Sequence, residues 1–168
     1  MKNYALAALM LLAVAVCDAT AASLFGRVVG VSDGDTVTVL TKENRQFKIR
    51  LSGIDAPEKK QAFGAHAKET LVHQLSGQNV VVEWTKTDRY GRIVGKVEVA
   101  GIDANLEQVR EGSAWVYTQY LRELALADRK LYLEAERVAK TERRGLWRDQ
   151  QPQAPWQWRK DQRNAQRG

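Results

Sequence analysis

Residues Thr36–Leu51 read TVTVLTKENRQFKIRL, and this stretch decides the fold. Polar and apolar residues alternate on both sides of a polar turn at Lys42–Arg45, which is typical of two antiparallel strands joined in a hairpin. Phe47 and Ile49 fall on one face of the second strand, whereas Arg50 falls on the opposite face. The pattern therefore predicts a hairpin with one buried face, and it places Arg50 where it can meet a ligand rather than the core.

Further segments with the composition of strands and helices flank this hairpin. Strands are predicted at Phe25–Val31, Thr36–Val39, Gln46–Leu51, Val80–Trp84 and Ile93–Val99. Helices are predicted at Glu58–Leu75, Ala104–Arg110 and Tyr120–Thr141. Apolar residues recur at helical spacing in the longest of these, at Leu121, Leu124, Leu131, Ala135 and Val138. The predicted class is α+β with a mostly β core, in the form of a five-stranded OB-type barrel with three helices.

The first residues, Met1–Ala22, have the layout of a secretory signal peptide, with Lys2 before an apolar run at Ala5–Val16. That run is well short of the roughly 20 residues that span a bilayer, so we expect no membrane span. A lipoprotein signal acylated at Cys17 is an alternative, although Val16 stands where a small residue would be expected. We therefore expect an exported chain that is periplasmic or secreted.

The remaining chain divides into a domain at 23–149 and a tail, Gln150–Gly168, that is basic, rich in Gln, Trp and Arg, and without an apolar period. We expect this tail to be mobile. The single cysteine, Cys17, would leave with the signal peptide, which excludes disulfides, thiolate zinc sites and thiol nucleophiles in the mature chain. A net charge of +6 favours polyanionic partners such as nucleic acid. We expect a monomer.

Three charged segments stand out, at Asp33–Thr36, Arg50–Glu58 and Asp88–Arg92. Taken alone, each has an ordinary explanation, since Asp-Gly turns are common and an acidic residue is favoured in the first turn of a helix. Together they offer hard carboxylate oxygens for a metal, a further carboxylate that can act as a base, and guanidinium groups for an anionic transition state. Hydrolysis of a phosphodiester needs each of these parts.

Asp35 and Asp55 each lie at the end of a predicted strand, so a folded barrel can bring them together as ligands for Ca²⁺ or a similar cation. Two carboxylates held close together would repel each other without such an ion. The aromatic residues near the charged segments are either part of the core or stacking surfaces for a nucleotide, and they are Tyr90, Trp115 and Tyr117.

These residues resemble the thermonuclease family, also called the staphylococcal or micrococcal nucleases, over roughly Phe25 to Trp147. The resemblance rests on the motifs Asp-Gly-Asp-Thr, Arg-(x)4-Asp-x-Pro-Glu and Asp-Arg-Tyr-Gly-Arg. Asn105–Gly112 is similar to the second helix of the family, and Ala114–Tyr117 follows it in the same order. The segment Pro155–Arg159 also resembles the ends of many bacterial members.

The resemblance implies a role for each matching position. Asp35 and Asp55 would supply the side-chain ligands of calcium, and Ala56 would add its backbone carbonyl. Glu58 matches the general base, and Arg50 and Arg92 match the two catalytic arginines. The residues that match the border of the nucleotide site are Arg89, Tyr90, Trp115 and Tyr117, with Trp115 standing where the family prototype has Tyr.

The implied enzyme is a secreted, calcium-dependent endonuclease that hydrolyses DNA and RNA and leaves 3′-phosphate ends. The alternative is a catalytically inactive OB-type module that only binds nucleic acid. Such a module would be expected to lack at least one of the acidic or arginine positions, and all five are present here. We assign no role to His66 or His73.

Overall fold

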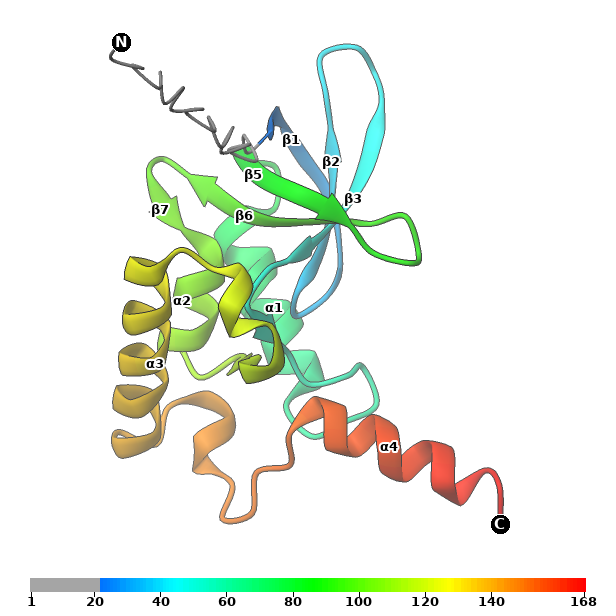
Figure 1. Cartoon of the computed structure of the whole chain (residues 1–168), viewed down its shortest axis with the longest axis vertical. Helices are drawn as coiled ribbons and strands as arrows, with labels where there is room; N and C mark the ends of the chain where they lie inside the picture. Colours follow the sequence, from blue (N-terminus) through cyan, green and yellow to red (C-terminus); the bar gives the residue numbers. More distant parts are fainter. Residues whose placement is uncertain (1–21) are drawn as a thin grey trace, which may run out of the picture.

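The computed structural model describes residues 22–168, so the predicted signal peptide lies, apart from Ala22, outside the described residues. The long strands are β1 (Ala22–Asp33), β2 (Thr36–Leu40), β3 (Gln46–Leu51), β5 (Asn79–Thr87) and β6 (Ile93–Val99). They follow one another in the antiparallel order β3-β2-β1-β5-β6, and a parallel pairing of β3 with β6 closes the sheet into a barrel (Figure 1). The predicted five-stranded OB-type barrel is confirmed.

The hairpin of β2 and β3 has the register that its alternation predicts, with Val37 opposite Ile49 and Val39 opposite Phe47. The side chains of Val37, Val39 and Ile49 are fully buried in the barrel. Arg50 lies on the other face, as predicted, and its side chain is 14% exposed. The hairpin thus supplies the core with one face and the functional site with the other.

The helices are α1 (Gly64–Leu75), α2 (Ala104–Arg110), α3 (Leu126–Thr141) and α4 (Pro155–Ala165). Helix α1 packs on β1, and α2 lies between α1 and α3 at one end of the barrel (Figure 1). Short strands complete the fold, at β4 (Ile54–Asp55), β7 (Ile102–Asp103) and β8 (Trp115–Val116). Short 3-10 segments lie at Thr118–Glu123 and Gly145–Arg148. Between residues 22 and 168, no helix has the length and apolar character that crossing a membrane requires.

The first predicted helix begins at Gly64 rather than at Glu58. The residues before it form tight turns, in which the backbone N–H of Gln61 donates to the carbonyl of Glu58 at 2.8 Å. Phe63 then has a positive φ of 63°, a left-handed conformation that an α-helix does not contain. Hydrogen bonds within these turns therefore delay the start of the helix to Gly64, although the residues before it have helical composition.

The predicted helix Tyr120–Thr141 is divided, because the backbone is extended at Leu124 and Ala125 before α3 begins. The break shifts the helical phase, so Leu131 is 51% exposed and its neighbour Tyr132 is fully buried. The hydroxyl of Tyr132 donates to Asp103 Oδ2 at 2.9 Å, and this bond ties α3 to the barrel. The predicted apolar face was wrong at Leu131 because the periodicity had been extended across the break.

The segment Gln150–Gly168, which we expected to be mobile, contains helix α4. Pro155 occupies its first turn and is buried, which suits a residue with no N–H to donate. The helix runs outward from the body of the molecule (Figure 1), and its first turns contact the body through residues that include Pro155, Trp156 and Arg159. An anchor of so few side chains produces no apolar period, and for this reason the sequence pattern missed the helix.

Candidate active site

The predicted catalytic and metal-binding residues converge at one end of the barrel, and the strand pairings explain why. Because β2 and β3 are antiparallel, the start of β2 lies beside the end of β3, and Thr36 pairs with Arg50. Asp35 directly precedes Thr36, so it reaches the same place. Strand β6 runs parallel to β3 with Ile93 beside Ile49, which brings the neighbouring Arg92 to this end as well.

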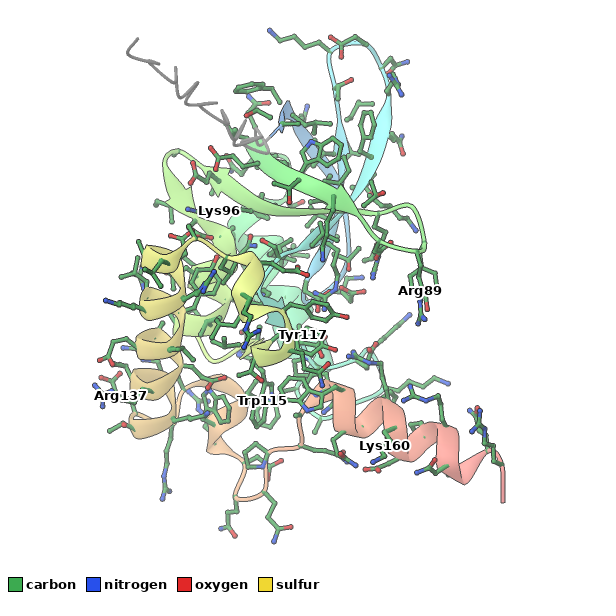
Figure 2. The ribbon with its side chains drawn as sticks, viewed as in Figure 1. Arg89, Lys96, Trp115, Tyr117, Arg137 and Lys160 are labelled. Atoms are coloured by element: carbon green, nitrogen blue, oxygen red, sulfur yellow. The ribbon has the colours of Figure 1, made fainter. Side chains whose placement is uncertain are left out.

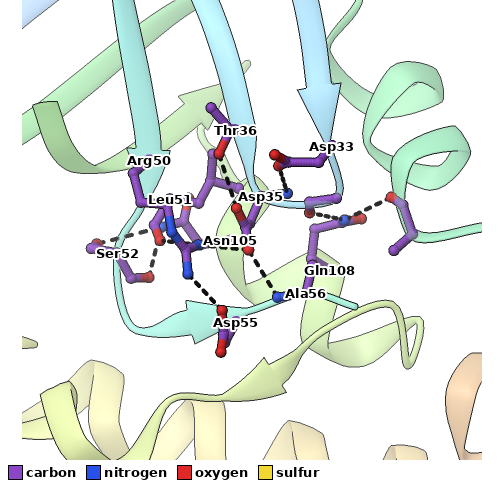
Figure 3. Close-up of polar contacts among 12 residues, drawn as sticks. Asp33, Asp35, Thr36, Arg50, Leu51, Ser52, Asp55, Ala56, Asn105 and Gln108 are labelled. Atoms are coloured by element: carbon purple, nitrogen blue, oxygen red, sulfur yellow. Dashed lines mark hydrogen bonds and ion pairs between the residues drawn. The ribbon is translucent and has the colours of Figure 1, made fainter. Parts of the chain in front are cut away.

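Asp35, Arg50 and Asp55 form a connected group, which Figure 3 shows in close-up. Arg50 Nη1 lies 2.7 Å from Asp35 Oδ2, and Arg50 Nη2 donates to Asp55 Oδ1 at 2.8 Å. The backbone N–H of Ala56 also donates to Asp35 Oδ2, at 2.9 Å. Burial lowers the pKa of Arg50, but the attraction of Asp35 and Asp55 outweighs it and raises the pKa overall. The guanidinium therefore stays charged and holds two carboxylates in fixed positions.

Two buried amides hold the loops that carry these carboxylates. Gln108 Nε2 donates to the carbonyl of Gly34 at 2.6 Å, and a Cβ at Gly34 would lie 2.6 Å from that of Ala67, so α1 packs tightly against the β1–β2 turn. Asn105 Nδ2 donates to the carbonyl of Ser52 at 3.0 Å, just before β4. Both amides come from α2, and the sequence analysis assigned neither a positioning role because an isolated Asn or Gln carries no pattern.

The donor chemistry of this group suits a hard cation. Burial is the largest influence on Asp55 and raises its pKa, although Arg159 and Arg50 oppose that effect. Burial, followed by the nearby charge of Asp35, raises the pKa of Asp33 to about 6. Within residues 22–168, no three Asp, Glu, His or Cys side chains come together as a metal-binding group. A cation here would take the two carboxylates of Asp35 and Asp55, and backbone or water oxygens would complete its shell.

Glu58 lies beside Asp55, and both contact a residue that the sequence analysis did not assign to the site. Arg159 of α4 donates from Nη1 to Glu58 Oε1 at 2.7 Å and from Nη2 to Asp55 Oδ2 at 2.8 Å. The same Nη1 lies 3.2 Å from Asp55 Oδ1. The backbone N–H of Glu58 donates to Gln61 Oε1 at 3.1 Å, which fixes the start of this segment. The side chain of Glu58 is 35% exposed, so it combines a fixed backbone with access to solvent.

Arg92 and its neighbours form the turn between β5 and β6. Arg92 Nε donates to Asp88 Oδ2 at 2.7 Å, and the other oxygen of Asp88 accepts the backbone N–H groups of Tyr90 and Arg92. Arg92 Nη1 lies 3.5 Å from the hydroxyl of Thr36, which itself donates to Asp35. The ring of Tyr90 is 69% exposed and lies under the guanidinium groups of Arg89 and Arg92, at 4.9 and 5.6 Å. This turn thus presents two cations and an exposed ring next to the acidic group.

A cleft of about 1060 Å³ runs past these residues. The β5–β6 turn forms one wall, and α4 forms the other with Trp156, Arg159, Lys160 and Arg163. Figure 2 shows Arg89 and Lys160 on the same side of the molecule, where both line this cleft.

Tyr117 and Trp115, the other two aromatic residues predicted to contact a nucleotide, have different surroundings. Tyr117 lines the cleft, and its ring stacks on that of Trp156 with 5.3 Å between centroids and 7° between planes. Trp115 is not brought to the cleft. Its ring packs against Trp147 at 4.3 Å and Trp156 at 5.7 Å, beside a smaller cavity of about 200 Å³.

An OB-type barrel with paired carboxylates, a further Glu and two arginines beside a basic cleft has the parts that phosphodiester hydrolysis requires. Comparison with known proteins agrees with this class. Residues 48–149 match the family described as staphylococcal nuclease homologue, and the chain belongs to that family. The predicted resemblance is confirmed, and the chain is a hydrolase of the nuclease type.

Relatives with similar sequences come from several bacteria. An uncharacterized endonuclease of Haemophilus influenzae is 43% identical over 137 residues, which cover 82% of this chain and 74% of that protein. A similar endonuclease of Escherichia coli is 42% identical over 139 residues, with 82% and 86% covered. A micrococcal nuclease of Shigella flexneri is 40% identical over 150 residues, with 83% of each chain covered.

Proposed function

We propose that this protein is an exported, calcium-dependent endonuclease that hydrolyses both DNA and RNA and leaves 3′-phosphate ends. The observation that carries the proposal is the convergence of Asp35, Asp55, Arg50 and Glu58 beside a long cleft with cationic walls. A cleft of this kind suits a polyanion of indefinite length, because each phosphate can be met by a guanidinium or ammonium group.

Asp35 and Asp55 are the residues that would hold Ca²⁺, together with the backbone carbonyl of Ala56. When bound there, the ion would withdraw charge from a phosphate oxygen and so favour attack on phosphorus. Oxygen donors without His or Cys suit a hard cation, and Ca²⁺ tolerates irregular coordination better than Mg²⁺ does.

Glu58 is proposed as the general base, because its carboxylate lies beside Asp55 and remains partly exposed. It would take a proton from a water molecule as the water oxygen attacks phosphorus from the side opposite the leaving group. The bond between phosphorus and the 5′ oxygen then breaks, the leaving oxygen takes up a proton from solvent, and the products are a 3′-phosphate and a 5′-hydroxyl. No side chain of the protein becomes phosphorylated in this scheme.

Arg50 and Arg92 are proposed to stabilise the negative charge that accumulates on the phosphoryl oxygens. Each guanidinium has five N–H donors, so the contacts of Arg50 with Asp35 and Asp55 leave other donors free for substrate. Arg89, Tyr90 and Tyr117 line the same cleft and are proposed to contact the phosphates and rings of flanking nucleotides.

The test is to incubate purified mature chain with plasmid DNA and with RNA in Ca²⁺, Mg²⁺ or excess chelator, and to analyse the ends of the products. We expect cleavage of both polymers in Ca²⁺, weak cleavage in Mg²⁺ and none in chelator. Asp35→Asn is the matched control, because it removes one proposed ligand oxygen with little change in volume. Full activity in chelator would contradict the mechanism, and binding without cleavage would favour the inactive OB-type module.

Export is proposed from Lys2, the apolar run Ala5–Val16 and the small residues that follow it. N-terminal sequencing of the protein recovered from the periplasm or medium should find a new end near Ala22. Retention of Met1 in an intracellular fraction would contradict export. We also propose that the mature chain acts as a monomer, which light scattering can check.

A further inference from the structure

Two guanidinium groups from distant parts of the chain bind the same buried carboxylate. Asp55 has a side chain that is 1% exposed, and it contacts Arg50 of β3 and Arg159 of α4. Arg159 also takes an oxygen of Glu58 at 2.7 Å. The proposed mechanism uses Arg50, whereas nothing in the chemistry described so far uses Arg159.

The oxygens that Arg159 occupies are those that the proposed chemistry needs. Asp55 must offer an oxygen to a divalent cation, and Glu58 must be free to accept a proton from water. Arg50 contacts Asp55 through Oδ1, whereas Arg159 takes Oδ2, the oxygen that Arg50 leaves for a cation, and it also takes an oxygen of Glu58. A divalent cation at Asp55 Oδ2 would lie within a few ångströms of the guanidinium that holds this oxygen now, and the two positive charges would repel each other. Binding of the cation and the present contacts of Arg159 are therefore mutually exclusive alternatives.

The rest of α4 has contacts of its own, so displacement of Arg159 does not require the helix to leave. Pro155 is buried, Trp156 stacks on Tyr117, and the side chain of Gln61 donates to the carbonyl of Gln153 at 2.7 Å. The side chain of Arg159 is 31% exposed and borders the cleft. Rotation about its own side-chain bonds can turn the guanidinium from the two carboxylates towards the cleft.

We propose that Arg159 is a third arginine of the active site, which neutralises Asp55 and Glu58 until a divalent cation binds and then contacts a phosphate of the nucleic acid in the cleft. The planar fork of a guanidinium suits a phosphate as well as it suits a carboxylate, so the same group can exchange one for the other. Lys160 and Arg163 line the same wall, which places a substrate phosphate within a cationic environment. This inference rests on the proposed function.

The first test measures binding of Ca²⁺ alone by isothermal titration calorimetry, without nucleic acid. Arg159→Gln removes the competing cation, so we expect it to bind Ca²⁺ about five- to tenfold more tightly than the wild type. Arg159→Lys retains the charge but loses the fork, and we expect an affinity between the two. Thermal unfolding of each variant establishes that it is folded.

Arg163→Gln is the matched control, since it removes the same charge from the same wall of the cleft one helical turn further on. We expect it to change Ca²⁺ affinity by less than about twofold, because Arg163 is exposed and solvent screens its charge from the acidic group. An affinity of Arg159→Gln equal to that of the wild type, or an equal gain in Arg163→Gln, would overturn the competition.

The same titration separates this inference from the proposed function. If the wild type and Asp35→Asn both fail to bind Ca²⁺, the calcium-dependent function itself fails. If the wild type binds and Asp35→Asn does not, the function stands, and the affinity of Arg159→Gln decides the inference alone.

The second test measures the transfer to phosphate, by fluorescence anisotropy of a labelled single-stranded oligodeoxynucleotide. An Arg92→Gln background slows cleavage without touching Arg159. In chelator, we expect Arg159→Gln to bind the oligonucleotide within about twofold of its parent, whereas in saturating Ca²⁺ we expect it to bind about fivefold more weakly. A deficit that is the same in both conditions, or absent from both, would overturn the transfer.

Discussion

Strand β3 and helix α4 each deliver an arginine to Asp55, but they hold that arginine in different ways. Strand β3 pairs with β2 on one side and with β6 on the other, so the backbone of Arg50 is hydrogen-bonded within a closed barrel. Helix α4 is held to the body through side chains of its first turns rather than by backbone pairing. The side chains are 14% exposed for Arg50 and 31% exposed for Arg159.

This difference indicates which of the two guanidinium groups, that of Arg50 or that of Arg159, stays in place at the site. Arg50 bridges Asp35 and Asp55, and its backbone is paired on both sides within the barrel. Arg159 contacts Asp55 and Glu58 from a separate helix, at the edge of solvent. A charge that must remain during catalysis suits the first arrangement, and a charge that must give way suits the second.

The largest effect should come from removing the arginine of the barrel. We expect Arg50→Gln to lower the free energy of unfolding by about 3 kcal/mol, because it leaves Asp35 and Asp55 buried without their shared partner. Arg159→Gln should lose less than about 1 kcal/mol, since its contacts are partly screened. Urea denaturation monitored by tryptophan fluorescence measures both. Equal losses in the two variants would break the comparison.

Substitution of Glu58, which contacts Arg159 of α4, tests the proposed base chemistry. We expect Glu58→Gln to lower kcat by about 10²-fold, the usual scale for a lost general base, while KM changes little. Single-turnover cleavage of a short DNA duplex in saturating Ca²⁺ gives the rate, with Glu69→Gln on the exposed face of α1 as the control. A folded Glu58→Gln variant with nearly normal turnover would remove Glu58 from the mechanism.

Truncation after Gln150 removes all of α4 and so tests the second wall of the cleft. We expect kcat to remain close to that of the full chain, whereas KM for long DNA rises several-fold and its dependence on salt becomes shallower. The free energy of unfolding should fall by roughly 1–2 kcal/mol, since Tyr117 and Trp115 lose the ring of Trp156.

Truncation after Ala165 leaves α4 intact and is the control for the loss of chain length. Unchanged KM, salt dependence and stability in the longer truncation would mean that α4 neither binds substrate nor supports the domain. A loss that is equal in both truncations would locate the effect in the last residues instead.

The smallest predicted effect concerns the anchor of α4. We expect Trp156→Ala to lower the free energy of unfolding by about 1 kcal/mol and to raise KM about twofold, because the stack on Tyr117 is lost while Pro155 and Arg159 remain. Stopped-flow quenching of tryptophan fluorescence by the oligonucleotide should then show faster dissociation. Dissociation at the rate of the full chain would place the anchor elsewhere.

The parts of the site that sequence reasoning predicted share one property. Asp35, Arg50 and Arg92 lie at the ends of strands whose alternation is local, and pairing rules bring those ends together. Gln108 and Asn105 could not be predicted in the same way, since a buried amide is recognised only by the carbonyls around it. The phase of α3 failed for a related reason, because the break at Leu124 depends on contacts outside the helix.

By itself, the sequence determined the barrel, the end of the barrel at which the charged residues converge, and the family. These follow from alternation, turn residues and motif spacing, all of which are properties of neighbours along the chain. Only the tertiary structure decided that Trp115 packs away from the cleft and that Arg159 reaches Asp55 and Glu58. Residues 55 and 159 are far apart in the chain, and a single arginine on a polar helix has no periodicity. Its partner is set by where the helix docks, and contacts such as the stack of Trp156 on Tyr117 contribute to that position.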